Sequence, residues 1–260
     1  MLDSFKRWFN GSSLSPEGRP LALWAKQHGH TFKTVKDRSG FVLDCSDEAK
    51  RHWRIEWGPS QRAYIAGLEL RLREEIGVHS DIQLMLISRH LADRLESAAF
   101  DSYTEAMQTQ IDTSLPEESR WLAMFPKVSL SAHKSLRPHF QLLGATQEWA
   151  DAWLNDEFAR ALESATQTFL KGGPEFVIMV MRGRLYMRVA APRVDGELLD
   201  QLCAIFRVAS ERTRALAGVL ESQMAASLAD DHASAMDSGE WPSTTGAAWQ
   251  ITGAQTRVKP

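Results

Sequence analysis

The chain has 260 residues, 43% of them hydrophobic, which is enough to bury a substantial core in one large domain or two small ones. The net charge of −3 gives no general attraction to phosphate backbones, so we expect no nucleic-acid partner. The longest strongly apolar run, 176–181, is far too short to cross a bilayer, and the first residues lack the apolar stretch of a signal peptide. These features predict a cytoplasmic protein without an integral membrane span.

The two cysteines, Cys45 and Cys203, form no CxxC motif and lie far apart in the sequence. A disulfide framework is therefore not expected, and no local cationic motif would lower the pKa of either thiol. We expect both thiols to be reduced and to serve packing.

The N-terminal part predicts one helix and one strand. Residues 20–28 place Leu21 and Trp24 at helical spacing, and Gly29 ends the pattern. A first strand is expected at 41–45.

Two neighbouring segments, 52–57 and 68–73, alternate strictly between apolar and charged residues, which is typical of half-buried antiparallel strands. The apolar positions are Trp53, Ile55, Trp57, Leu68, Leu70 and Leu72, and the charged positions facing the other way are His52, Arg54, Glu56, Glu69, Arg71 and Arg73. Together with 41–45 and the apolar segment 82–87, these strands predict a four-stranded meander.

The next part of the chain predicts helices. A helix over 88–99, with Ser88 as its N-cap, should follow the last strand and pack across the sheet. Between 101 and 146 three prolines interrupt every pattern, so only a short helix beginning at Pro116 is predicted, and whether this region joins the sheet is left open. Residues 147–171 carry large apolar side chains at helical spacing, which predicts one long amphipathic helix.

A hairpin and another long helix follow. The apolar segments 176–181 and 185–189 flank Gly183, which predicts a β-hairpin whose first strand lies inside a sheet. Asp195 is suited to cap a helix over 195–222, with acids early and arginines late along its length.

These elements predict an α+β fold, in which an antiparallel meander sheet and a later β-hairpin are covered by amphipathic helices at 88–99, 147–171 and 195–222. The expected domains are an N-terminal segment over 1–18, for which mobility is one alternative, a core over 19–225, and a disordered tail over 226–260 that lacks any period. A sub-boundary within 101–146 is the alternative to a single core.

No motif of a known catalytic chemistry stands out. Ser60, His52 and Glu56 would supply a nucleophile, a base and an orienting acid, but a polar strand face need not approach the loop tip, and a GxSxG sequence is absent. A GxxxxGK[ST] phosphate loop is absent as well. We therefore lean toward a protein that is not an enzyme.

Metal binding also finds little support. His28 and His30 flank one glycine and would need His79 or His90 from elsewhere, but no third ligand stands at a diagnostic spacing. A helix end and an exposed turn explain the first two histidines more simply. No metal and no cofactor is predicted.

The charged faces of the two alternating strands suggest a ligand site, whose residues would be His52, Arg54, Arg71 and Arg73, with Arg62 from the intervening loop. If the strands pair, this cationic strip is suited to a carboxylate, a phosphate or an acidic partner. The favoured alternative is a solvated face whose charge is balanced by Glu56, Glu69 and Glu74.

Both ends of the chain carry aromatic residues. Trp241 and Trp249 stand in the expected tail, where they either dock back on the domain or contact a partner. An apolar side of one or two helical turns, suited to a membrane interface, is formed by Leu2, Phe5, Trp8 and Phe9. Packing or fraying of this short segment is the favoured alternative.

The sequence favours a soluble, non-catalytic binding or adaptor protein with an unknown protein partner. One alternative is an enzyme or a small-anion sensor that uses the Arg- and His-lined sheet face. Another is a peripheral membrane-associated protein that uses residues 2–9. The sequence does not define the substrate, the partner, the pathway or the oligomeric state.

Overall fold

The computed structural model describes residues 18–35, 40–105 and 116–237, with the side chains of all of these except 102–105 and 223–237. The chain divides into two units, Met1–Gly218 and Val219–Pro260. The sheet and the packing described below belong to the first unit.

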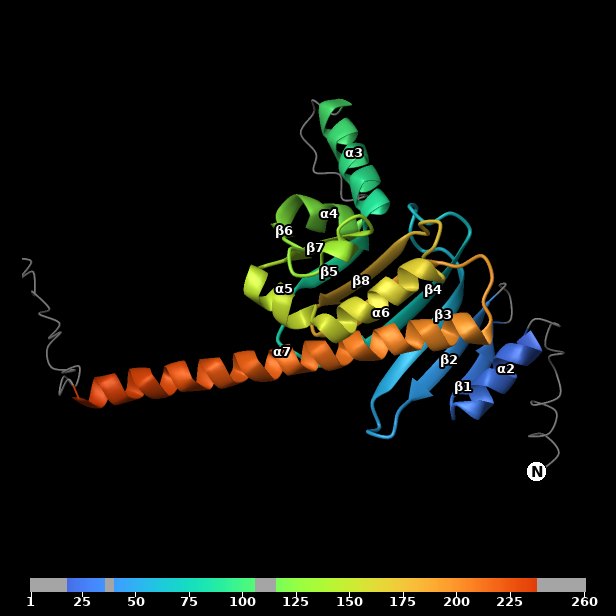
Figure 1. Ribbon diagram of the computed structural model, residues 1–260. Coiled ribbons are helices and arrows are strands. Elements are labelled where there is room, and N and C mark those ends of the chain that lie inside the picture. Colours follow the sequence, from blue (N-terminus) through green and yellow to red (C-terminus); the bar gives the residue numbers. More distant parts are fainter. Residues whose placement is uncertain (1–17, 36–39, 106–115, 238–260) are drawn as a thin grey trace, which may run out of the picture. The chain divides into compact units, whose positions relative to one another are not determined.

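The described residues form one antiparallel sheet of nine strands in the order β1-β2-β3-β4-β9-β8-β5-β7-β6 (Figure 1). The strands are β1 Thr31–Thr34, β2 Phe41–Ser46, β3 His52–Pro59, β4 Leu68–Glu75, β5 Leu84–Ser88, β6 Lys127–Val128, β7 Phe140–Gly144, β8 Phe176–Met181 and β9 Arg184–Ala190. The α-helices of the described ranges are α2 Gly18–Gln27, α3 Arg89–Glu105, α4 Glu117–Met124, α5 Gln147–Trp153, α6 Asp156–Gln167 and α7 Gly196–Asp237. The predicted α+β fold with an antiparallel sheet is confirmed.

Three predicted strands, β2, β3 and β4, pair in sequence order. Ile55 of β3 lies opposite Leu43 on one side and Leu72 on the other. These three side chains are at most 1% exposed. The apolar half of each alternating pattern therefore faces the core, as the pleat of a half-buried strand requires.

The fourth strand of the expected meander was placed wrongly. β5 does not pair with β4, because β9 lies along β4 and β8 lies along β5. β5 is buried at all five positions, so it needs a strand on each edge and a layer on each face, which the end of a meander does not provide. β1, which the sequence did not predict, pairs with β2 at the edge of the sheet instead.

The predicted hairpin of 176–181 and 185–189 is confirmed as β8 and β9. Its two-residue turn consists of Arg182 with φ 51° and Gly183 with φ 74°. Two positive φ values define the type I′ turn, whose twist matches that of the flanking strands. β8 lies inside the sheet between β9 and β5, as its apolar sequence indicates.

Two further strands come from the middle of the chain, for which no strand was predicted. β7 pairs with β5, and the two-residue strand β6 pairs with β7. All five residues of β7 are buried. This part of the chain therefore joins the sheet and contributes to its core.

The prediction of one continuous helix over 147–171 is wrong. This part of the chain forms two helices, α5 and α6, which are separated at Leu154 and Asn155. The Asn155 side chain caps α6 by accepting a hydrogen bond from the backbone N–H of Phe158 at 3.0 Å, and two acidic residues occupy the first turn. Asparagine followed by two acids is a helix-start signal that the spacing of the large apolar residues concealed.

Helix α7 begins where it was predicted, with Asp195 accepting a hydrogen bond from the backbone N–H of Leu198 at 2.9 Å. The helix continues to Asp237. It therefore runs beyond 222, where the predicted helix ends, and beyond 226, where the tail was expected to start. The remainder of the expected tail lies outside the described residues.

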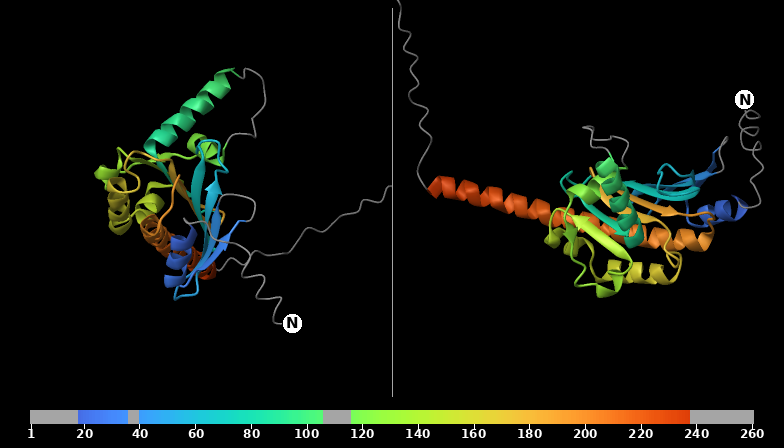
Figure 2. Two further views of the ribbon diagram at one scale, coloured as in Figure 1. Left: turned by 90° about the vertical axis from the view of Figure 1, so that its right-hand side faces the viewer. Right: turned by 90° about the horizontal axis from the view of Figure 1, so that it is seen from above.

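Helices cover the two faces of the sheet differently (Figure 2). On one face lie α5, α6 and the first part of α7, where Trp153 donates from Nε1 to Thr213 Oγ1 at 2.9 Å. On the other face α3 and α4 pack over β5, β7 and β8, where Met85 and Met179 share a buried cluster with Trp121. The same face over β3, β4 and β9 carries charged side chains, and there the candidate site lies.

Replacing Asn155 by Ala should lower the free energy of unfolding by about 1 kcal/mol, because α6 loses its capping acceptor. Urea denaturation followed by circular dichroism measures this change. Asn155→Ser keeps an acceptor and should stay within about 0.5 kcal/mol of the unchanged protein. Equal losses in the two variants would mean that packing, not the cap, starts α6.

Candidate functional site

Charged side chains gather on one face of β3, β4 and β9. In the register of these strands, Arg54 lies opposite Arg73, and Arg73 lies opposite Tyr186. One row along, Arg71 lies opposite Arg188. Directly opposed residues of antiparallel strands have Cβ atoms about 5 Å apart, so these side chains form one surface. We call the surface of Arg54, Arg71, Arg73, Tyr186 and Arg188 the arginine face.

The arginine face contains a shallow pocket of about 80 Å³. Strands β3, β4 and β9 and one loop line it with Arg54, Glu56, Gln61, Arg71, Leu72, Arg73, Tyr186, Met187 and Arg188. Four guanidinium groups and one carboxylate therefore surround the space.

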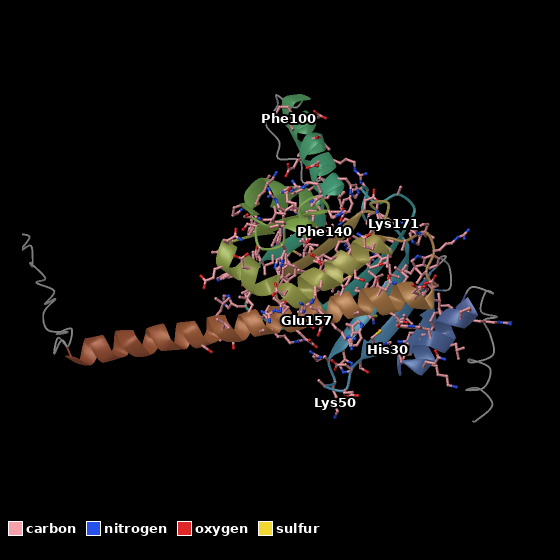
Figure 3. All side chains as sticks on the ribbon, in the orientation of Figure 1. His30, Lys50, Phe100, Phe140, Glu157 and Lys171 are labelled. Atoms are coloured by element: carbon pink, nitrogen blue, oxygen red, sulfur yellow. The ribbon has the colours of Figure 1, made fainter. Side chains whose placement is uncertain are left out.

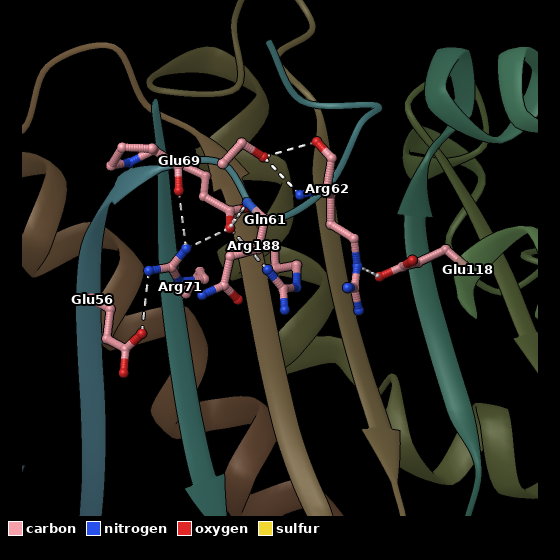
Figure 4. Close-up of polar contacts among 9 residues, drawn as sticks. Glu56, Gln61, Arg62, Glu69, Arg71, Glu118 and Arg188 are labelled. Atoms are coloured by element: carbon pink, nitrogen blue, oxygen red, sulfur yellow. Dashed lines mark hydrogen bonds and ion pairs between the residues drawn. The ribbon is translucent and has the colours of Figure 1, made fainter. Parts of the chain in front are cut away.

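A buried carboxylate fixes two of these arginines (Figure 4). Glu69 of β4 is 0% exposed, and its Oε1 accepts hydrogen bonds from Arg71 Nη1 at 2.8 Å and Arg188 Nη1 at 3.0 Å. The backbone N–H of Gln61 donates to the same oxygen at 3.0 Å. Arg71 also pairs with Glu56, with 3.2 Å between Nη2 and Oε2. These contacts compensate the cost of burying the Glu69 charge.

A second buried carboxylate lies at the margin of the arginine face. Glu118 of α4 is 0% exposed and accepts a hydrogen bond from Arg62 Nε at 3.1 Å. Burial, together with the negative charge of Glu118, raises the pKa of Tyr64, so this phenol stays protonated. The Arg62–Glu118 pair ties α4 to the loop between β3 and β4.

Arg73 differs from the other arginines of the pocket. Arg54 donates to Asp44 Oδ1 at 2.9 Å, and Lys33 donates to Asp44 Oδ2 at 2.6 Å. The hydrogen bond from Lys33 and the contact with Arg54 outweigh partial burial and lower the pKa of Asp44. Arg73 is exposed and makes no hydrogen bond or ion pair within the described ranges. Among the described residues it is therefore a cation without a counter-charge in the middle of a cationic surface.

The structure brings together three of the five residues that the sequence suggested for a ligand site, Arg54, Arg71 and Arg73. Arg62 lies in the loop and pairs with Glu118. His52 lies opposite Ser46, outside the pocket lining. The cationic groups of the pocket thus come from the strands, whereas the loop contributes Gln61 and the strand end contributes no lining residue within the described ranges.

Tyr186 and Arg188 were not predicted as site residues, and they come from a strand far along the chain. A signal was present, because 184–189 also alternates between polar and apolar residues. The expectation that Glu74 balances the strip is wrong, since Glu74 faces α7 and pairs with Arg214. Alternation along β4 explains this, because Glu74 shares the parity of the buried Leu72.

The suggested metal residues do not form a site. The ring centroids of His28 and His30 lie 6.1 Å apart, and His79 faces Asp81 in an exposed turn. His90 lies in a separate groove at the start of α3. Among the described residues, no group of three or more His, Cys, Asp or Glu side chains is placed to hold a metal ion.

The suggested nucleophile serves its loop instead. Ser60 Oγ donates to the Arg62 carbonyl oxygen at 2.9 Å and accepts from the Arg62 N–H at 3.0 Å. Glu56 pairs with Arg71, and His52 begins the strand that ends just before Ser60. These three residues therefore do not converge as a nucleophile, a base and an orienting acid.

Both cysteines are free thiols. Burial raises the pKa of Cys45, and burial together with Asp200 raises the pKa of Cys203 to about 12. Thiols with raised pKa values are poor nucleophiles, which agrees with a packing role.

The residues suggested for contacts at the chain ends lie outside the described residues, namely Leu2, Phe5, Trp8, Phe9, Trp241 and Trp249. Of the helices in the described ranges, none is long and apolar enough to cross a membrane. The roles suggested for the six residues at the chain ends stay predictions.

No protein-family model matches the chain, and no curated protein matches its sequence. Among solved structures, it is similar to the crystal structure of the mycobacterial trehalose monomycolate transport factor A, TtfA. The TM-score is 0.41 at 10% sequence identity, over 75% of this chain and 93% of that chain. A similarity this low indicates nothing about the function of this chain.

Replacing Glu69 by Gln should lower the free energy of unfolding by about 3 kcal/mol, because Arg71 and Arg188 lose the buried charge that compensates them. Glu56→Gln removes the half-exposed partner of Arg71 and should cost about 1 kcal/mol or less. Urea denaturation measures both changes. A loss at Glu69 no larger than that at Glu56 would show that the buried carboxylate does not hold the face.

The stability of the protein should fall in mild acid because of His30. Burial, with His28 nearby, lowers the pKa of His30 from its ordinary value of 6.5. Below this pH the unfolded chain takes up the proton first, so the free energy of unfolding falls until the lowered pKa is passed. His30→Phe keeps a ring beside Trp24 and Trp53 without a titrating group. Between about pH 7 and pH 5 its urea midpoint should fall less than that of the unchanged protein, and parallel profiles would contradict this assignment.

Proposed function

We propose that this protein is a non-catalytic binding protein whose arginine face holds an acidic segment of a partner protein. The observation that carries the proposal is Arg73, an exposed cation without a counter-charge in the described part of the chain, set between Arg54 and Tyr186. A guanidinium group presents its donors in a planar fork that matches a carboxylate. A carboxylate of the partner would supply the missing counter-charge.

The surrounding charges favour an anionic segment over a neutral one. The pocket lining carries four guanidinium groups against Glu56, and the buried Glu69 charge is already shared by Arg71 and Arg188. A local surplus of positive charge raises the association rate of acidic partners and disfavours basic ones. Because the whole chain carries a net charge of −3, this attraction is confined to the arginine face.

The fixed arginines lower the cost of binding. The side chains of Arg71 and Arg188 are 16% and 13% exposed and are held by Glu69. Long side chains that are ordered before a partner arrives lose little further conformational entropy on binding. Tyr186 adds an amphipathic ring beside them, of the type enriched in protein interfaces.

The size of the pocket supports a second candidate function, the binding of a free small anion. A space of about 80 Å³ exceeds what one water molecule needs and is comparable to a carboxylate or phosphate group. The same arginines would bind either ligand. A protein segment differs because it also makes contacts beyond the pocket, so it should bind more tightly than the free anion.

Fluorescence anisotropy with a labelled hexaglutamate peptide at low salt tests the proposal. Arg73→Glu should weaken binding by about tenfold or more, since it removes a charge-assisted hydrogen bond and adds repulsion. The matched control is Arg160→Glu on α6, which makes the same charge change at an exposed arginine without a side-chain partner in the described ranges. The control should leave the affinity unchanged, and added salt should weaken binding to the unchanged protein.

Three outcomes would count against this function. If hexaglutamine binds as tightly as hexaglutamate, the charge of the peptide plays no role in binding. An equal loss in Arg160→Glu would mean attraction to the whole surface instead of the arginine face. Phosphate or acetate binding as tightly as the peptide would favour the small-anion function.

Arg73→Gln should leave the free energy of unfolding within about 0.5 kcal/mol of its original value, because this side chain has no partner in the described ranges. Thermal and urea denaturation measure the difference. A clear loss of stability would show that Arg73 has a structural role, and binding defects of its variants would then have to be attributed to the fold.

A further inference from the structure

A second and larger concavity lies away from the arginine face. It is a groove of about 950 Å³ lined by the end of α2, the loop after it, the β2–β3 hairpin and the first part of α7. Figure 3 shows His30 beside α2 and Lys50 at the tip of the hairpin. The volume is in the range of small-molecule sites.

Aromatic rings form one wall of this groove. Trp24 stacks on His28 with 4.3 Å between ring centroids, and His30 lies 5.7 Å from Trp24 and 5.5 Å from Trp53. The faces of such rings attract cations, and tryptophan does so most strongly. Burial lowers the pKa of His30, so at neutral pH this ring adds no positive charge to the wall.

The charges around the groove are mostly negative. Its lining contains four carboxylates and two guanidinium groups, from Asp47, Glu48, Asp200, Glu211, Arg51 and Arg207. Asp200 accepts a hydrogen bond from Trp24 Nε1 at 2.9 Å and thereby holds one ring in place. Glu48 is exposed and has no side-chain partner within the described residues. The carboxylates of this lining therefore outnumber its guanidinium groups by two.

Two buried polar atoms of the aromatic wall have no hydrogen-bond partner within the described ranges. They are the indole nitrogen of Trp53, a residue 9% exposed, and Nδ1 of His30. A buried N–H donor without an acceptor destabilises the fold, and such groups are retained where a water molecule or a ligand accepts the hydrogen bond. The Trp53 N–H therefore calls for an acceptor at the wall of the groove.

We infer that this groove binds an organic ammonium ion that carries a hydrogen-bonding oxygen. The rings of Trp24 and Trp53 and the carboxylates of Glu48 and Asp200 attract the cation, and the oxygen accepts from the Trp53 N–H. A free amino alcohol shares this chemistry with a lysine residue of a partner protein, whose backbone carbonyl supplies the oxygen. The inference is independent of the function proposed above, because Trp53 and the adjacent Arg54 point to opposite faces of β3.

Choline is a suitable probe, because it is a quaternary ammonium ion with a hydroxyl group. Its control is the neutral isostere in which a carbon atom replaces the nitrogen. We expect choline to shift the indole N–H signals of Trp24 and Trp53 in NMR spectra of the full chain, with these signals assigned from Trp→Phe variants. The isostere should leave them in place at the same concentration.

Charge-neutralising variants locate the site. Glu48→Gln and Asp200→Asn should each weaken choline binding by about two- to fivefold, and both keep the shape of the side chain. The matched control is Glu157→Gln on α6, an exposed carboxylate outside the groove, which should bind choline as before. Arg73→Glu should also leave choline binding unchanged, so failure here and failure of the arginine face can be told apart.

The inference is overturned if choline moves neither indole signal, if the isostere binds equally, or if Glu157→Gln weakens binding as much as the groove variants. A lysine with both backbone ends blocked identifies the source of the cation. Tighter binding than choline favours a lysine of a partner protein, and weaker binding favours a free amine.

Discussion

The single sheet depends on the hairpin formed by β8 and β9. The strands β1 to β4 and the strands β5, β7 and β6 do not pair with each other, and the hairpin joins them by pairing with β4 on one side and β5 on the other. Its type I′ turn fixes the register of β8 against β9. The register of β9 against β4 then places Tyr186 and Arg188 on the same side as Arg71. Both the core and the arginine face are therefore completed by pairing between segments far apart in the sequence. Pairing over such a sequence separation is slow compared with the formation of local contacts.

Burial separates the roles of neighbouring arginines. Arg71 and Arg188 are committed to Glu69, whose burial would otherwise be strongly unfavourable, so they maintain the structure of the face. Arg73 stands two residues from Arg71 on the same side of β4, but it has no such partner in the described part of the chain. An exposed cation that lies among other cations does not stabilise the fold. This contrast is why we place the proposed binding position at Arg73 and assign its structural support to Glu69.

Period two allowed much of this fold to be predicted, because alternation reports which face of a strand is buried. It located β3 and β4, and the same pattern in β9 contained the information that would have found Tyr186 and Arg188. The order of the strands could not be predicted from alternation. An apolar strand such as β5 indicates that both of its faces are covered, but it does not indicate which strands lie beside it. The helix prediction failed at Asn155 for a different reason. The apolar residues of α5 and α6 keep the same spacing across Asn155, so the helix cap between them was not recognised.

Alternation along β3 also gives one strand two opposite surfaces. Arg54 contributes to the arginine face, whereas Trp53 lines the groove rich in carboxylates, and the two sites share no lining residue. Because β2 and β4 hold β3 along its length, a ligand in one site has little means of moving the other, and the coupling free energy between the sites should be close to zero. An adaptor needs two surfaces that can be occupied together, and surfaces of opposite charge disfavour competition for the same partner. The pleat of one strand is thus sufficient to give the proposed binding protein two independent contacts, one for an anion and one for a cation.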